Sequence, residues 1–267
     1  MQVGGRPALV CRALEPFARH LMTTRAWQLG MPAADSSEAW GEVAAAVETP
    51  LLRAHQVHGA DVLVQRAGDR REIGPNHARA DVIVTNDPTV AIAIQTADCV
   101  PILIVDRRTG AVAAAHAGWR GLAASVPRVA VDALVRETGS RVEELIAAAG
   151  PSIGACCYEV GEDVRARFLE AGWKTSMTGR WFFEAPQPSV GNPSMPRVRG
   201  TDPGRWYFDS AAAAGDQLES AGVPRGQIFV AGLCTASHAG VFCSYRRDGA
   251  PAGRMAAVIR SGPPHRP

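Results

Sequence analysis

Short apolar runs rich in β-branched residues recur through the first half of the chain, and they limit its possible folds more than any other feature. Gly, Pro, Asp or Asn bounds each run, which is typical of strands that end in tight turns. Asp106 to Gly110 places turn residues between two of the runs, as in a hairpin. The pattern predicts strands over residues 51–53, 62–65, 82–84, 90–94, 102–105 and 111–115.

Helical segments are fewer and do not alternate strictly with the strands. They cover residues 36–47, 121–137, 161–171 and 209–221, with Asp209 as the N-cap of the last, and two further strands are expected over 228–231 and 254–259. No Gly-rich phosphate-binding fingerprint follows a strand. We therefore predict an α+β fold with mixed or antiparallel sheets rather than a doubly wound nucleotide-binding fold.

The length of 267 residues favours a single domain over residues 1–267. Glu184 to Gly204 contains five prolines and three glycines and is expected to be a surface loop. The charge is nearly balanced, with 28 basic and 26 acidic residues and no basic cluster, which argues against nucleic acid as a partner. A small-molecule substrate remains the expected partner, and the oligomeric state stays open.

No stretch approaches the roughly 20 apolar residues that span a bilayer, so no membrane partner is expected. The first residues lack the long apolar core and cleavage site of a signal peptide. We therefore expect a cytoplasmic protein whose six cysteines are reduced thiols rather than disulfides.

Three segments combine potential metal ligands with turn residues at the ends of predicted strands. They are His55 to Gly59, Thr96 to Pro101 and His116 to Gly121. Strand ends can gather at one edge of a sheet, so these ligands can converge, and two histidines with one cysteine leave a fourth zinc position for water. Taken singly, a buried Cys is usually a core residue and a His before Gly a turn residue, so the structural reading of each stays open.

The segments HQVHG, TADCVP, HAGWRG, GPSIGACCYEVG and CTASHAGVFCSYRRDGAPAGR, in this order, resemble the successive signatures of the laccase-domain family. Its members are also called YfiH-like or multicopper polyphenol oxidase proteins. The resemblance runs from about His55 to the last predicted strand and implies that His58, Cys99 and His116 bind one zinc ion. It also implies a layered α/β/β/α sandwich with mixed sheets.

The activity implied by this resemblance is purine nucleoside phosphorylase, which converts adenosine, inosine and methylthioadenosine to base and ribose 1-phosphate, together with adenosine deaminase. The older family label implies copper-dependent polyphenol oxidation instead. A multicopper laccase needs a further cluster of histidines. The chain has seven histidines, of which His20, His77 and His265 lie in no motif, and this is too few for such a cluster. A single copper bound by two His and one Cys remains an alternative to zinc.

The proposed reactions need a carboxylate that moves protons and an arginine that grips phosphate. Asp98, next to Cys99, is the carboxylate candidate, although strand alternation would point it to the opposite face, and a purely structural role stays open. Arg25, Arg120 and Arg246 are the phosphate candidates, each of which can equally be a surface ion-pair residue.

Two further residues, His238 and Tyr245, are candidates for the side of the pocket that binds the base. Family members carry a glycine-rich loop after Thr-Thr-Arg, whereas this chain reads TTRAWQLG, and the loop near Gln187 is a candidate to compensate.

Two other classes of protein remain open. In a metal-free Cys-His hydrolase, His116 would activate Cys99 as the nucleophile, and a non-catalytic interaction protein would only have kept the fold.

Overall fold

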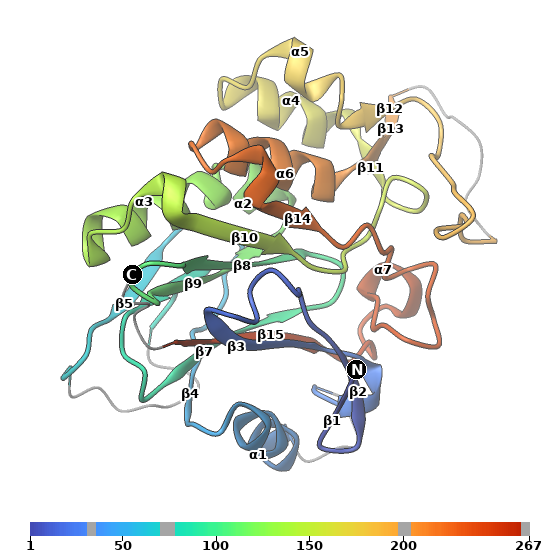
Figure 1. Cartoon of the computed structure of the whole chain (residues 1–267). Helices are drawn as coiled ribbons and strands as arrows, with labels where there is room; N and C mark the ends of the chain where they lie inside the picture. Colours follow the sequence, from blue (N-terminus) through green and yellow to red (C-terminus); the bar gives the residue numbers. More distant parts are fainter. Residues whose placement is uncertain (31–35, 70–77, 197–203, 263–267) are drawn as a thin grey trace.

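Two mixed sheets packed face to face form the centre of the protein, with helices on both outer sides (Figure 1). The computed structural model describes residues 1–30, 36–69, 78–196 and 204–262. The first sheet has the strand order β1 (Gln2–Val3), β2 (Arg6–Leu9), β3 (Ala18–Thr23), β15 (Met255–Ser261), β7 (Ala91–Thr96) and β4 (Leu51–Leu52).

The second sheet has the order β14 (Ile228–Val230), β10 (Leu145–Ala149), β8 (Val100–Asp106), β9 (Val112–Ala117), β6 (Val82–Thr85) and β5 (Val62–Gln65). Both sheets are mixed, because β4 pairs with β7, β5 with β6 and β10 with β14 in parallel, while the other pairs are antiparallel. A small third sheet joins β11 (Glu159–Gly161), β13 (Arg205–Phe208) and β12 (Phe182–Phe183).

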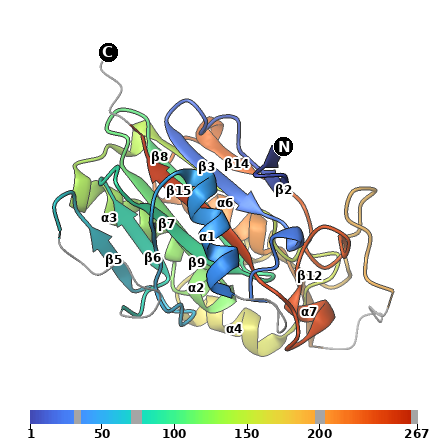
Figure 2. The ribbon, with the colours of Figure 1, turned by 90° about the horizontal axis from the view of Figure 1, so that it is seen from below.

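Three apolar clusters correspond to the interfaces between the layers. Helix α1 (Ser36–Val47) packs Val43 and Val47 on the outer face of the first sheet, and Figure 2 shows it crossing that face. Ile92 and Leu103 lie in the cluster between the two sheets. The third cluster lies between the second sheet and the helices α2 (Trp119–Ala123), α3 (Val126–Thr138), α4 (Glu162–Glu170) and α6 (Ser210–Ser220). The expected α+β sandwich with layered mixed sheets is confirmed.

The predicted strands of the first half are present with small shifts of their ends, but the helix expected over residues 121–137 is two helices, α2 and α3. The break lies at Ser125, whose φ of 62° is left-handed, and Pro127 lies in the first turn of the next helix, where its missing backbone N–H costs no hydrogen bond. Strands β1 to β3 and β10 were not expected from the sequence. Two short helices, α5 (Thr175–Thr178) and α7 (Tyr245–Asp248), were also not expected.

The expected surface loop from Glu184 has neither helix nor strand as far as residue 196, and residues 197–203 lie outside the described part. His77 and His265 also lie outside the described residues. All six cysteines are free, as expected. Among the helices of the described residues, none has the length and apolarity needed to cross a bilayer.

Candidate active site

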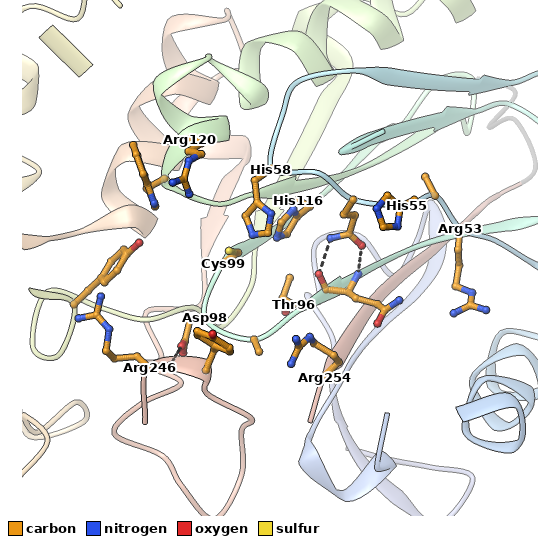
Figure 3. Close-up of a pocket in the computed structure, with 17 residues that line it drawn as sticks. Arg53, His55, His58, Thr96, Asp98, Cys99, His116, Arg120, Arg246 and Arg254 are labelled. Atoms are coloured by element: carbon orange, nitrogen blue, oxygen red, sulfur yellow. Dashed lines mark hydrogen bonds between the residues drawn. The ribbon is translucent and has the colours of Figure 1, made fainter. Parts of the chain in front are cut away.

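His58, Cys99 and His116 come together at one end of the second sheet. Their potential ligand atoms all lie within 4.8 Å of one another, and the two imidazole ring centroids are 4.8 Å apart at an interplanar angle of 78°. Figure 3 shows the three side chains pointing toward one another. Sequence reasoning placed these residues at three strand ends, and the structure brings all three to a shared space.

The β8–β9 hairpin positions two of the three residues. In this antiparallel pair Pro101 lies opposite His116, so Cys99, just before β8, comes close to the imidazole. Two hydrogen bonds between the Gln56 side chain and the β7 backbone position the third residue, His58. The Gln56 side chain accepts from the Gln95 N–H at 2.7 Å and donates to the Gln95 carbonyl at 2.8 Å, which fixes the His58 loop over β7.

Asp81, which the sequence reasoning did not identify, connects His58 and His116. Its carboxylate accepts backbone N–H groups from Val57, His58 and Gly59 at 3.2, 3.0 and 2.7 Å. Such convergence is possible because His58 has a left-handed φ of 60°. The same carboxylate lies 2.8 Å from Nδ1 of His116 and leaves Nε2 for the shared space. The sequence shows only an aspartate directly before an apolar strand, and this pattern alone does not indicate a role at the site.

The three residues and Asp81 form one electrostatic unit. Burial raises the pKa of Cys99, but hydrogen bonds and charges from His116 and His58 outweigh it and lower the value to about 7. Burial lowers the pKa of His116, but Asp81 and Cys99 outweigh it and raise the value to about 9. Without a metal, the pair therefore favours a thiolate beside an imidazolium, and a bound cation would replace that proton.

This donor set fits a zinc ion. Two imidazoles and one thiolate are ligands that zinc takes in catalytic sites, and all three residues line one open cavity, so a fourth position faces that cavity. Gly118 supports the fit, because a Cβ built there would lie 3.0 Å from both Cys99 Sγ and His58 Cδ2. A glycine at this position keeps the space around the ligands clear.

The cavity has a volume of about 560 Å³ and four arginines in its wall: Arg53, Arg120, Arg246 and Arg254. Arg120 lies over the Trp119 ring at 4.2 Å, and Arg246 lies over Tyr158 at 5.1 Å. In Figure 3, Arg120 and Arg246 lie on one side of the three ligands and Arg53 on the other. The volume is that of a small-molecule site, and the excess of positive charge favours an anionic ligand.

Asp98 lines the same cavity as Cys99, contrary to the expectation from strand alternation. The reason is that residues 97–99 form a bend rather than a strand, and Asp98 has a left-handed φ of 86°. Its carboxylate accepts the Thr235 hydroxyl at 2.6 Å and the Arg246 N–H at 2.7 Å. Burial raises the pKa of Asp98, while these hydrogen bonds act in the opposite direction.

The structure places the remaining candidates unevenly. Tyr245 lines the cavity, whereas Arg25, Gln187 and His238 are not in its wall. The Arg25 guanidinium donates to the Ala239 carbonyl, and the Gln187 backbone N–H donates to the Ala155 carbonyl. His238 Nδ1 lies 2.7 Å from the Cys234 carbonyl. Neither a phosphate role for Arg25 nor a compensating role for Gln187 gains support from this placement.

We expect Cys99 of metal-stripped protein to react with iodoacetamide as a thiolate, with a rate that rises through pH about 7. Mass spectrometry of the alkylated peptides would give this rate against pH. Cys243 is the control, because burial raises its pKa. Added zinc should block the reaction at Cys99, and a Cys99 rate that rises only at alkaline pH would contradict the prediction.

Replacing Gly118 by alanine should weaken zinc binding about tenfold, because the new Cβ would crowd the sulfur and one imidazole. The backbone permits alanine, since Gly118 has φ −72°. A metal-competition titration would measure the loss. Gly215→Ala in α6 is the matched control, because its Cβ would meet Val230 at an ordinary 3.6 Å, and equal zinc affinity in both variants would refute the steric argument.

The sequence profile of the family described as multi-copper polyphenol oxidoreductase laccase matches residues 33–261. A purine nucleoside phosphorylase of Deinococcus radiodurans is 39% identical over 207 residues, which cover 78% of this chain and 68% of that protein. An adenosine deaminase, RL5, from an unknown prokaryotic organism is 35% identical over 174 residues, covering 65% of this chain and 59% of that protein.

Among solved structures, that of YlmD from Geobacillus stearothermophilus superposes with a TM-score of 0.79 and 28% identity, covering 98% of both chains. The sequence of a purine nucleoside phosphorylase YlmD from the same organism is 34% identical over 208 residues, covering 76% of this chain and 69% of that protein. The profile, the sequence relatives and the fold agree. This chain belongs to the family of multi-copper polyphenol oxidoreductase laccases, the YfiH-like laccase-domain proteins.

Proposed function

We propose that this chain is a zinc-dependent purine nucleoside phosphorylase that also deaminates adenosine, working as one catalytic domain over residues 1–267. Its substrates would be adenosine, inosine and methylthioadenosine, and its products free base and ribose 1-phosphate. One observation carries the proposal: a His, His, Cys group opens into a cavity with four arginines in its wall. Relatives named purine nucleoside phosphorylase and adenosine deaminase support the substrate class.

His58, Cys99 and His116 would hold the zinc ion, which when bound acts as a Lewis acid that polarises substrate or activates water. Asp81 would keep both imidazoles in position through its contacts with His116 and the His58 loop. A carboxylate that is hydrogen-bonded to a ligating histidine in this way fixes the tautomer and orientation of its ring.

Phosphate would bind to the arginine side of the cavity. A guanidinium grips two phosphate oxygens at once, and Arg120 and Arg246 lie on the same side of the ligand group (Figure 3). The rings of Trp119, Tyr158 and Tyr245 in the wall offer apolar faces for a purine. Asp98 would exchange a proton with the departing or reacting base, and its bonds to Thr235 and Arg246 hold it in place.

The decisive experiment incubates zinc-loaded protein with adenosine, with and without phosphate, and separates the products by chromatography. We expect adenine and ribose 1-phosphate only when phosphate is present, and inosine in both cases. Hypoxanthine should follow from inosine when phosphate is present. Absence of base release with phosphate would overturn the phosphorylase proposal, and absence of inosine would overturn the deaminase proposal.

Replacing Arg120 by glutamine should raise the KM for phosphate about tenfold, because a charged hydrogen-bond donor to an anion is lost. Deamination, which needs no phosphate, should change much less. Arg180→Gln is the matched control, since Arg180 forms a surface ion pair with Asp216 at 2.9 Å. An unchanged KM for phosphate in Arg120→Gln would remove this residue from the phosphate site.

A metal-free Cys-His hydrolase is the second candidate, favoured by the pKa of Cys99 near 7 beside His116. Full activity after zinc removal, lost on alkylation of Cys99, would support it. Multicopper phenol oxidation has less support. In the part of the chain that the structure describes, His58, Cys99 and His116 are the only group of three or more potential ligands that contains histidine.

A further inference from the structure

Three cysteines outside the cavity wall form a second cluster. Cys156 and Cys157 lie in the turn before β11, and Cys234 follows β14, where a parallel bridge pairs it with Ser152. Their sulfur atoms lie within 4.8 Å of one another, although Cys234 follows the other two by 77 and 78 positions in the sequence. Neither the proposed phosphorolysis nor the proposed deamination uses these thiols.

This three-cysteine cluster is surrounded by apolar and sulfur-containing side chains and is closed to water. The three residues are only 1–2% exposed, and Ile153, Ala236 and the thioether-bearing Met195 pack against them. Apolar burial alone would favour three neutral thiols. Two backbone N–H groups oppose this, because Gly154 donates to Cys234 Sγ at 3.4 Å and Met195 donates to Cys157.

Hydrogen bonds from N–H to sulfur are typical of thiolates that bind metals. The backbone after Cys234 is also held in place, since the Arg247 guanidinium, which forms an ion pair with Asp248, donates to the carbonyls of Thr235 and Ala236. Pairing two of the thiols as a disulfide would leave the third unused. All three sulfurs can act as ligands together only if they bind one thiophilic cation.

We propose that Cys156, Cys157 and Cys234 form a buried second metal site for a cuprous ion, separate from the His58, Cys99 and His116 group. Binding would release the thiol protons to solvent and form copper–sulfur bonds, with no change of oxidation state. Copper would enter already as Cu(I), the form that a reducing environment maintains.

The number and kind of donors favour Cu(I) over zinc. Structural zinc takes four protein ligands, whereas this cluster offers three sulfurs, and their burial leaves no open position for water. The Ser237 hydroxyl lies 3.6 Å from Cys156 Sγ and 3.9 Å from Cys157 Sγ, and its neutral oxygen is a poor zinc ligand. Thiolate and thioether donors select Cu(I), which two or three sulfurs satisfy.

The site would also be linked to the cavity. Thr235, next to Cys234, donates its hydroxyl to Asp98, and the Ile153 N–H donates to the Asp98 carbonyl. A metal that fixes the segments around Cys156 and Cys234 would therefore fix two supports of Asp98. The proposal does not depend on nucleoside chemistry and can be tested by metal binding alone.

The test titrates reduced, metal-stripped full-length protein with Cu(I) under anaerobic conditions, against a chromophoric Cu(I) chelator. We expect one tight copper per chain, with affinity reduced roughly 100-fold or more in Cys156→Ser and in Cys234→Ser. Cys243→Ser is the matched control, because Cys243 is equally buried but stands outside the cluster. Cys243→Ser and Cys99→Ser should keep the tight copper.

Three results would overturn the proposal. They are no copper retained against the chelator, tight copper lost in Cys99→Ser but kept in the two cluster variants, and copper displaced from the cluster by equimolar zinc. X-ray absorption of the wild-type protein with one equivalent of Cu(I) gives an answer that needs no variant to fold. A shell of sulfur neighbours alone supports the site, and a shell that contains imidazole nitrogen contradicts it.

Discussion

Replacing Cys99 by serine should lower bound zinc to a small fraction of one ion per chain. It should also reduce kcat/KM for adenosine roughly 1000-fold, because a bound metal stabilises the transition state by several kcal/mol. The thiolate is the one anionic ligand of the three, and its charge offsets much of the charge of the cation. Metal analysis of purified protein and phosphorolysis of adenosine would be measured on the same samples. Cys243→Ser controls for the loss of a buried thiol.

His58→Ala separates the two chemistries that Cys99 could serve. A zinc enzyme should lose metal and activity together when either ligand is removed. A Cys-His hydrolase needs only Cys99 and His116, so it should keep most of its activity without His58, which is exposed. Activity of His58→Ala close to that of the unmodified protein would therefore sink the zinc assignment, whatever the result for Cys99→Ser.

Replacing Asp81 by asparagine should weaken zinc binding and lower activity roughly 100-fold, although Asp81 is not itself one of the proposed metal ligands. The neutral amide keeps one oxygen acceptor but loses the charge that three N–H groups and the His116 ring share. His116 would also lose the partner that fixes its tautomer. Zinc affinity by metal competition and kcat/KM for adenosine would report both effects.

Asp87→Asn is the matched control, because Asp87 is also a buried carboxylate but accepts from Thr89 in a turn away from the cavity. It should alter thermal stability only. If Asp81→Asn lowers the melting temperature while zinc affinity and kcat/KM stay unchanged, the carboxylate only supports the fold, and the argument that it orients the ligands fails.

The three ligand positions could be predicted because each lies near the end of a strand that the apolar runs predict and carries a residue type that binds zinc. Asp81 and Gly118 could not, because their roles lie in contacts that form only when distant segments meet. Asp98 was expected to point away from Cys99, since the bend at residues 97–99 is not visible in a pattern of apolar residues. Arg25 looked equivalent to Arg120, because the sequence does not show that only Arg120 of the two lies in the cavity wall.

The same limit explains the missed strands. The β10 segment, Leu145–Ala149, is mostly alanine, whose intrinsic preference is helical, and its pairing with β8 and β14 makes it a strand. Strand β2 has only four residues and contains a proline, which weakens any strand signal. Tertiary pairing, rather than local preference, decides these elements.

The place of β15 in the first sheet sets the order in which that layer can be completed during synthesis. It is the last strand of the described chain, yet it lies between β3 and β7 and pairs with both. While the ribosome is still making residues before 255, the N-terminal strands and β7 have no partner across that gap. The hairpin that carries Cys99 and His116 needs only residues that emerge much earlier. We therefore expect a nascent chain to hold two of its three ligands in place well before that layer closes behind them.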